Sequence, residues 1–402
     1  MRVLHVNKFL YRRGGAEGYL FDVARLQERD GDEVAFFGMA HPENDRMRYA
    51  AHFPSHVDLY RDRVAAAGRM LWSTTARAGL RRVIADFEPD VVHLHNVYHQ
   101  LSPSVVAAAR DAGVPCVMTL HDYKLACPSY QMLDHGRPCD ACVTGGPMQA
   151  ARRSCKDGSR SASTLLAVES WLHRRFRAYE GVGAFLAPSR FLAGVLTRAG
   201  VYPDRLHVLR HPVDVDAMAA KQAPGGGVLF AGRLAPEKGV DTLIEAAAML
   251  PPEITVDVAG DGPSRAALET QAAGRVRFHG RLRREELHDL VRRSGVVAVP
   301  SRWYENQPLA VLEAFGCGVP VVGTDMGGLP ELITAGVDGE VVPPDDPQAL
   351  AAALARTLGS LDRAWRMGLA GRDKVSRDFG PARHLAGLRA AYAAAGTPVA
   401  VA

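Results

Sequence analysis

The residues whose types and spacing could do chemistry are concentrated in the second half of the chain. Glu313 stands eight residues after Glu305, and between them Pro308 and Leu309 have the pattern of a helix start, after an apolar run, VVAVPS, that is predicted as a buried strand. In a strand–loop–helix unit, the backbone N–H groups at the helix N-terminus can hold an anion such as phosphate. Both carboxylates could then line one pocket around a phosphate. The alternative is an ordinary βαβ unit with two solvated glutamates.

Two cations come from an earlier strand–loop–helix pattern. The apolar run GVLFAGRL delivers Arg233 at its end, and LAPEKG places Lys238 just before a predicted helix. Arg can bind two phosphate oxygens at once and Lys acts as a compact point charge, so the pair suits a diphosphate. A plain surface loop is the alternative, and it is weakened because GDGP and the Glu305 loop recur downstream at regular spacing.

Weaker signals lie in the first half of the chain. Gly14 and Gly15 form the turn between the first predicted strand and helix, where glycine lets the backbone approach a ligand closely. His121 and Asp122 close a predicted strand at the edge where doubly wound sheets bind ligands. Further histidines near predicted strand ends are His93, His95 and His99. Their spacing matches no standard zinc pattern, so we interpret them as polar residues at strand termini.

Four of the six cysteines fall within 29 residues of one insertion, residues 123–164. They are Cys127, Cys139, Cys142 and Cys155. A CxxC pair flanked by two more cysteines resembles a structural zinc site more than a disulfide framework, although reducible thiols or a disulfide remain the alternative. A zinc ion with four protein ligands has no open position, so we expect it to brace a loop and take no part in catalysis.

The composition is that of an ordinary soluble globular chain of two or three domains, with 402 residues, 47% apolar and 23% charged. No stretch approaches 18 uninterrupted apolar residues, and the start has too short an apolar run for a signal peptide, so we expect a cytoplasmic protein. Residues 1–212 hold 28 basic and 21 acidic side chains, whereas the remainder holds 20 and 23. The basic half suits an anionic partner, with a solvated surface that binds no partner as the alternative. Without a basic run interleaved with aromatics we expect no nucleic acid.

One segment could make that anionic partner a membrane. Residues 61–87 are predicted as a basic amphipathic helix, which could rest peripherally on anionic lipid at the inner face of the cell membrane. The alternative is a helix packed on its domain with its arginines in water.

Strands alternate with helices along the whole chain, which indicates an α/β fold with parallel sheets. The pattern is interrupted by a Pro-, Gly- and polar-rich stretch and then restarts. We therefore predict an N-terminal Rossmann-like domain over residues 1–212, a linker over 213–227 and a C-terminal domain over 228–379. A last amphipathic helix is predicted over 380–396.

Taken together, the motifs resemble glycosyltransferase family 4. They are GRLAPEKG, AGDGP, HG with Arg281, PSRWYENQPLAVLEAFGCGVPVV and GGLPELI, and GGAE, LHDY and the closing helix extend the similarity over nearly the whole chain. The resemblance implies the GT-B fold, in which two Rossmann-like domains face each other across a cleft and the C-terminal helix crosses back to the first domain. It also implies a retaining, metal-independent transfer of a hexose-type sugar from a nucleotide diphosphate, of the UDP or GDP type, to a hydroxyl.

The resemblance also implies roles for single residues. Arg233 and Lys238 would bind the diphosphate and stabilise its growing charge, Glu305 would bind the donor sugar and stabilise an oxocarbenium-like transition state, and His121 would contact the sugar near the reacting carbon. The remaining donor-binding residues, placed around the phosphates, ribose and base, would be Gly14, Gly15, Arg281, Asn306, Gln307, Pro308, Leu309 and Glu313.

The sequence departs from the family pattern at one point. Asn306 and Gln307 stand where relatives often have Gly-Phe-Gly, and these side chains could read sugar hydroxyls. No catalytic cofactor is expected. The acceptor is expected to be a lipid-linked or polysaccharide intermediate. Alternatives are a small secondary-metabolite acceptor, a sugar-nucleotide epimerase of the same fold, and a non-catalytic nucleotide-sugar-binding scaffold.

Overall fold

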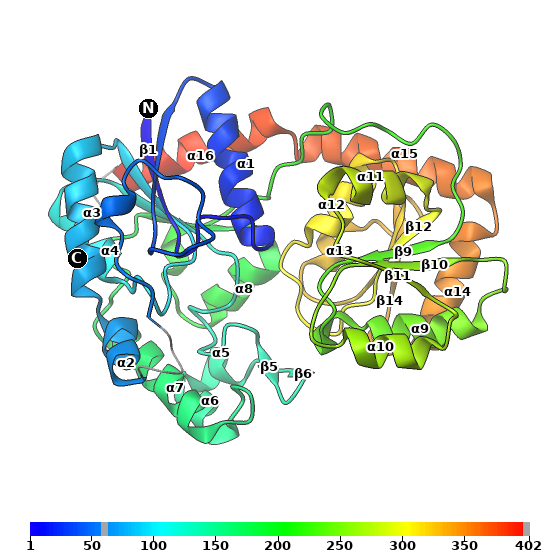
Figure 1. The fold of residues 1–402 in the computed structure, drawn as a ribbon, viewed down its shortest axis with the longest axis horizontal. Coiled ribbons are helices and arrows are strands. Elements are labelled where there is room, and N and C mark those ends of the chain that lie inside the picture. Colours follow the sequence, from blue (N-terminus) through cyan, green and yellow to red (C-terminus); the bar gives the residue numbers. More distant parts are fainter. Residues whose placement is uncertain (58–62, 397–402) are drawn as a thin grey trace. The chain divides into compact units, whose positions relative to one another are not determined.

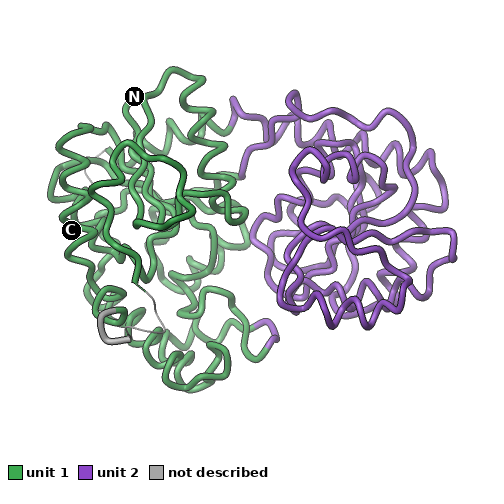
Figure 2. The backbone as a smooth tube through the Cα atoms, in the orientation of Figure 1, with its two compact units in different colours: residues 1–135, 139–210, 384–402 green, residues 136–138, 211–383 purple. Residues whose placement is uncertain are grey.

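The computed structural model describes residues 1–57 and 63–396, and side chains are described from Ala66 onward in the second range. The described chain divides into two compact units (Figure 2). Unit 1 comprises Met1–His135, Cys139–Arg210 and the chain from His384 on, and unit 2 comprises Gly136–Pro138 and His211–Arg383.

Unit 1 is built on a six-stranded parallel sheet in the order β2-β1-β3-β4-β7-β8. Figure 1 labels strand β1 of this sheet and the helices of the unit. Its strands are β1 (Arg2–Val6), β2 (Glu33–Phe37), β3 (Val91–Leu94), β4 (Cys116–Thr119), β7 (Ala184–Ala187) and β8 (Leu206–Val208). Its helices are α1 (Gly15–Arg29), α2 (Arg63–Leu71), α3 (Thr74–Phe87), α4 (Ser104–Asp111), α5 (Ala141–Gly145), α6 (Met148–Arg153), α7 (Arg160–Arg175), α8 (Arg190–Arg198) and, from His384 on, α16 (Pro381–Gly396). A small hairpin of β5 (Leu133–Asp134) and β6 (Arg137–Pro138) lies in the insertion.

Unit 2 has a second six-stranded parallel sheet, in the order β11-β10-β9-β12-β13-β14. Its strands are β9 (Val228–Ala231), β10 (Val256–Ala259), β11 (Arg277–Gly280), β12 (Val296–Val299), β13 (Val321–Thr324) and β14 (Gly339–Val342). Its helices are α9 (Val240–Met249), α10 (Arg265–Ala272), α11 (Arg284–Arg293), α12 (Leu309–Gly316), α13 (Leu329–Leu332), α14 (Pro347–Leu358) and α15 (Leu361–Asp378).

Both faces of the unit 2 sheet are covered, which explains why its strands are continuous apolar runs. In β12, Val296 and Ala298 point into a core shared with α9, α10 and α14. Val297 and Val299 alternate with them and point into a core shared with α11, α12, α13 and α15. The predicted α/β fold with two Rossmann-like parallel sheets is therefore confirmed.

The last helix belongs to unit 1. Leu388, Ala391 and Tyr392 of α16 pack in one hydrophobic cluster with residues of α1 and of strands β1, β3, β4 and β7. The Tyr392 hydroxyl is 2.9 Å from Nδ1 of His93 in β3 and accepts a 3.0 Å hydrogen bond from Gln27 of α1. The chain thus returns to the first unit after completing the second.

Residues 213–227 pack on unit 2, whereas the sequence predicted a linker. Val213, Val215 and Met218 are buried in the core beneath α12, and the Lys221 ammonium donates to the Ser294 carbonyl. The Pro- and Gly-rich composition suggested exposed chain, but the apolar side chains between those residues anchor the segment.

The predicted helix over 61–87 is also different in the structure. It is two helices, α2 and α3, because the Ser73 hydroxyl caps α3 by accepting from the Ala76 N–H. Arg61 of that prediction lies outside the described residues, and α3 buries Leu80, Val83 and Phe87. Among the described helices, none is both long and apolar enough to cross a membrane.

Candidate active site

The site in unit 2 is set by the order of its strands. Strands β9 and β12 are far apart in sequence but pair directly, with Leu229 opposite Val297. The order of the sheet reverses between them, since β10 and β11 lie on one side and β13 and β14 on the other. Parallel sheets bind ligands outside the carboxyl ends of their strands at such a reversal. The loops that follow β9 and β12 carry Lys238 and Glu305.

Lys238 and Glu305 form an ion pair with 2.7 Å between Nζ and Oε1. The Ser301 hydroxyl donates to the same carboxylate oxygen at 2.6 Å, and the ammonium lies 5.0 Å from the ring centroid of Trp303. The Glu305 side chain is 6% exposed and that of Lys238 20%. The pair is therefore largely screened from water but open on the lysine side.

The electrostatics of this pair keep Glu305 ionised. Burial alone would raise the pKa of its carboxyl group, but the Lys238 charge, the Lys238 hydrogen bond and the Ser301 hydroxyl outweigh burial and lower that pKa below its ordinary value. The site thus holds a fixed negative charge directly beside a fixed positive one.

Two glycines hold the loops in place. Gly239 has φ +67°, and a Cβ there would lie 2.0 Å from the carbonyl oxygen of Pro300, so the β9 and β12 loops can approach only at a glycine. Gly327 has φ +64°, and a Cβ there would lie 2.3 Å from the Glu305 carbonyl oxygen. The next N–H, of Gly328, donates to that oxygen at 2.6 Å. The Glu305 backbone is thereby clamped from the loop after β13.

Other residues predicted for the site occupy the same sheet edge but have partners of their own. The Arg233 guanidinium, 57% exposed, forms an ion pair with Glu237. Glu313 in α12 has its Oε1 3.9 Å from Nε2 of His288. Arg281 follows β11, two strands from β9. The residue at the N-cap of α12, Pro308, makes no side-chain capping hydrogen bond.

The Gln307 side chain, which the sequence suggested could read sugar hydroxyls, makes a contact within unit 2. Its side chain is buried, and its Oε1 accepts a 2.8 Å hydrogen bond from the backbone N–H of His211. Its Nε2 has no hydrogen-bond partner among the described residues. The amide oxygen therefore fixes the packed segment after β8, and only the amide nitrogen remains for a ligand. Asn306 is half-buried in the same loop.

Unit 1 brings its predicted residues to the carboxyl edge of its own sheet. Gly14 and Gly15 begin α1 directly after the β1 loop. His121 follows β4, and its Nε2 lies 3.1 Å from Nδ1 of His95. His95 in turn contacts His5, whose other nitrogen contacts Gln27. Burial lowers the pKa of His121 to about 3, so its imidazole is neutral and can act as a donor or acceptor but not as a cation.

Two family models together match most of the chain. Residues 13–217 match the model described as Glycosyltransferase Family 4, and residues 225–360 match Glycosyl transferases group 1. The chain belongs to glycosyltransferase family 4. It is accordingly a glycosyltransferase of the GT-B fold.

Relatives at moderate identity support the assignment. The glycosyltransferase is 28% identical over 322 residues to an alpha-maltose-1-phosphate synthase of Mycolicibacterium smegmatis, covering 72% of this chain and 75% of the relative. It is 34% identical over 239 residues to a D-inositol 3-phosphate glycosyltransferase of Xylanimonas cellulosilytica, covering 53% and 57%. Among solved structures, a sucrose-phosphate synthase of Thermosynechococcus elongatus matches with TM-score 0.71 at 17% identity over 98% of both chains. The Anabaena protein HepE, solved with UDP, matches with TM-score 0.68 at 20% identity over 98% and 100%.

Sequence reasoning missed four residues that position the Lys238–Glu305 pair of this glycosyltransferase. They are Ser301, Trp303, Gly239 and Gly327. All four lie inside motifs that were recognised, but their roles depend on contacts between loops that a linear pattern does not specify. The signal available in the sequence was that Ser301 and Trp303 stand close to Glu305.

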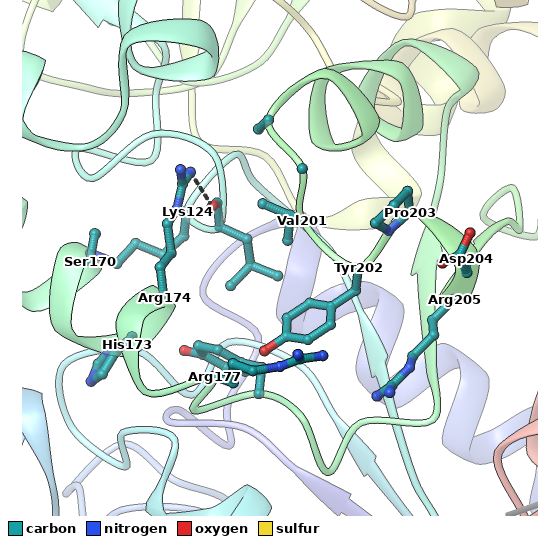
Figure 3. A pocket seen from close by; sticks show the side chains of 14 residues that line it. Lys124, Ser170, His173, Arg174, Arg177, Val201, Tyr202, Pro203, Asp204 and Arg205 are labelled. Atoms are coloured by element: carbon teal, nitrogen blue, oxygen red, sulfur yellow. Dashed lines mark hydrogen bonds between the residues drawn. The ribbon is translucent and has the colours of Figure 1, made fainter. Parts of the chain in front are cut away.

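A further cavity, of about 440 Å³, lies in unit 1 of the glycosyltransferase and contains none of the predicted site residues (Figure 3). Basic side chains line it, but each is engaged. Arg177 and Arg205 both pair with Glu180 at 2.7 Å, and Arg174 donates to the carbonyl of Leu125 at 2.8 Å. Lys124 pairs with Glu169 at 2.7 Å. The charges there stabilise the fold around α7 and leave no unpaired cation within this set for an anionic ligand.

Proposed function

We propose that this glycosyltransferase moves a hexose-type sugar from a nucleotide diphosphate to a hydroxyl with retention of the anomeric configuration and without a metal ion. The observation that carries the proposal is the Lys238–Glu305 pair at the strand reversal of unit 2. When a sugar–phosphate bond breaks, positive charge develops on the sugar and negative charge on the departing diphosphate. A carboxylate and an ammonium held side by side match that pattern of charges.

Each residue then has a defined task. Glu305, ionised and clamped by Ser301 and Gly327, accepts hydrogen bonds from donor sugar hydroxyls and stabilises the oxocarbenium-like carbon. Lys238 stabilises the leaving diphosphate. Arg233 also binds the diphosphate, and to do so it gives up its ion pair with Glu237 for contacts with phosphate oxygens. Because two protein cations neutralise the diphosphate, the chemistry needs no divalent ion.

The other donor contacts follow from the backbone. The N–H groups that begin α12, after Asn306 and Gln307, suit the phosphates, and Glu313 in the same helix suits the ribose hydroxyls. We assign Arg281 to the region of the base. In unit 1, we assign the Gly14–Gly15 turn and the neutral His121 to contacts with phosphate and sugar.

The donor and acceptor classes are drawn from relatives. HepE was solved with UDP and with UDP-glucose, which supports a UDP-type donor, with GDP as the alternative. The named relatives include a maltose-1-phosphate synthase, glycogen synthases and inositol phosphate glycosyltransferases, which supports sugar-phosphate or polysaccharide acceptors. The excess of basic residues in the first half suits an anionic acceptor, such as a lipid-linked sugar phosphate.

The test compares transfer by Glu305→Gln and Lys238→Ala with the wild-type enzyme, using UDP- and GDP-sugars with candidate acceptors in excess chelator. We expect both variants to lose about 10²-fold or more in kcat, since a preformed electrostatic contact to the transition state is removed. Glu286→Gln is the matched control, because Glu286 forms an exposed ion pair with Arg283 in the same unit.

Four results would contradict parts of this proposal. Full activity in both variants would remove the charge pair from the mechanism. Loss of transfer in chelator would show a need for metal, and inversion at the anomeric carbon, read by NMR of the product, would exclude retention. A donor sugar epimerised in the absence of acceptor would indicate an epimerase.

A further inference from the structure

The insertion between β4 and β7 contains a small hydrophobic cluster built around its cysteines. Its cluster of buried residues consists of Cys142, Ala150 and Ala167, with Ala151 and Cys155 packed against it. Helices α5 and α6 have only five and six residues. Small folded segments that cannot bury enough apolar surface are usually held by a disulfide or a metal ion.

All four cysteines of the insertion line one small cavity, of about 10 Å³. They are Cys127, Cys139, Cys142 and Cys155. The Cys127 thiol lies 3.2 Å from the Ser129 hydroxyl, and all four cysteines are unpaired by disulfide. The four cysteines lie on four different segments. Cys127 lies in the turn after Lys124, Cys139 at the end of the β5–β6 hairpin, Cys142 in α5 and Cys155 in the segment after α6. Four thiols that line one cavity from separate segments are the ligand types of a tetrahedral thiolate site.

We propose that these four cysteines bind one structural zinc ion. Zinc prefers four thiolate ligands in tetrahedral geometry, and a site closed by four protein ligands leaves no position for a substrate. The ion would tie the β5–β6 hairpin, α5 and the chain after α6 to the turn at Cys127. It is thus distinct from the Lys238–Glu305 site and independent of the proposed transfer reaction.

The surroundings suit the charge of such a centre. Zinc with four thiolates carries two negative charges, and the Arg153 side chain lines the same cavity. Arg153 is held there by an ion pair with Asp134, 2.9 Å away in β5. A second arginine, Arg174, donates to the carbonyls of Leu125 and Ala126 beside Cys127.

A short series of hydrogen bonds connects the cysteine site to the carboxyl edge of the unit 1 sheet. The Lys124 ammonium donates to the carbonyl of Pro128, next to Cys127, at 3.0 Å and to Glu169 of α7 at 2.7 Å. The Lys124 N–H donates to the Asp122 side chain, which directly follows His121. Fixing Cys127 therefore also fixes the segment that leaves the carboxyl end of β4.

The other candidate for a metal in the described residues is the trio His5, His93 and His95, whose ligand atoms lie within 4.8 Å of one another. Every nitrogen in that trio already has a hydrogen-bond partner, including Gln27 and Thr119. A metal would have to break this network. No three of the four cysteine sulfur atoms lie within 4.8 Å of one another. Zinc binding would therefore draw the four cysteine-bearing segments closer together.

The test is the metal content of full-length protein purified with a phosphine reductant and without chelator. We expect about one zinc per chain, and less than about 0.2 in Cys142→Ser. Cys317→Ser is the matched control, because Cys317 is equally buried but lies in unit 2, and it should keep its zinc. If Cys142→Ser does not fold, Cys139→Ser replaces it in the zinc measurement, because Cys139 is half-exposed and its substitution disturbs packing less.

A second readout does not depend on any variant. Wild-type protein loaded with Co²⁺ should show the intense near-ultraviolet absorption of thiolate-to-cobalt charge transfer, and adding zinc should abolish it. Less than about 0.1 zinc per chain after incubation with excess zinc and desalting would overturn the proposal. So would unchanged zinc in both cysteine variants, or a Cys127–Cys142 disulfide that persists in reductant.

Discussion

At the scale of single residues, Lys238 and Glu305 show what a linear pattern can and cannot predict. Each was predicted for the site from its own motif, because a cation and a carboxylate near helix starts are typical of phosphate and sugar binding. That they form one ion pair, with Ser301 as a third member, could not be predicted, since 67 residues separate them and only the pairing of β9 with β12 brings them together.

The glycine that clamps Glu305 supports a sharp prediction. Gly327→Ala should reduce transfer by about 10²-fold, since the added Cβ displaces the Glu305 backbone and with it a transition-state contact. Gly336→Ala is the matched control, because Gly336 also has positive φ, +77°, but has nothing within 4 Å of the added Cβ.

Both glycine variants carry the cost of placing alanine in a left-handed conformation, about 1–2 kcal/mol in the free energy of unfolding. Measuring kcat and thermal unfolding for the two therefore separates backbone strain from displacement of the carboxylate. Equal loss of activity in both would show that the Glu305 clamp has no catalytic role.

At the scale of elements, the central strands were predictable because buried parallel strands are continuous apolar runs. Strand β8 was not, since its three residues, Leu206–Val208, include a histidine and precede a Pro-containing stretch. The β5–β6 hairpin has two-residue strands and no apolar alternation to detect. The break between α2 and α3 depends on the Ser73 cap, which interrupts a pattern that otherwise keeps a helical period.

The attachment of α16 to unit 1 can be tested at one hydroxyl group. Tyr392→Phe leaves His93 and Gln27 without their buried partner, so we expect a loss of about 1–3 kcal/mol in the free energy of unfolding of unit 1. Tyr98→Phe is the control, because Tyr98 is as deeply buried but its hydroxyl has no hydrogen-bond partner among the described residues. Denaturant unfolding of both variants measures the difference, and equal stabilities would contradict the assigned role of Tyr392.

At the scale of the whole molecule, the order of elements predicted two sheets, and the restart of the strand–helix pattern predicted where the second begins. The exact division depends on packing. Val213 and Met218 commit the connecting segment to unit 2, whereas α16 joins unit 1 after 173 residues of unit 2. The burial of individual side chains decides which unit each segment joins, whereas the composition of residues 213–227 indicated a linker.

Buried histidines give the molecule a predictable response to acid. Burial lowers the pKa of His5 and His384 to about 4 and that of His93 well below its ordinary value of 6.5. His121 behaves in the same way. Below pH 6.5 the unfolded chain binds protons that the folded chain does not, so the free energy of unfolding should fall as the pH drops from about 6.5 toward 4.

The size of this effect is set by the number of histidines. Burial also lowers the pKa of His99 and His173. Each histidine contributes up to about 1.4 kcal/mol per pH unit, so the six together give a steep loss of stability. His384→Asn should reduce the slope of stability against pH by about a sixth. Denaturant midpoints measured between pH 8 and 4.5 give these slopes. Stability that is constant or rises on acidification would contradict the prediction, because it would mean that the buried histidines take up protons as readily as those of the unfolded chain.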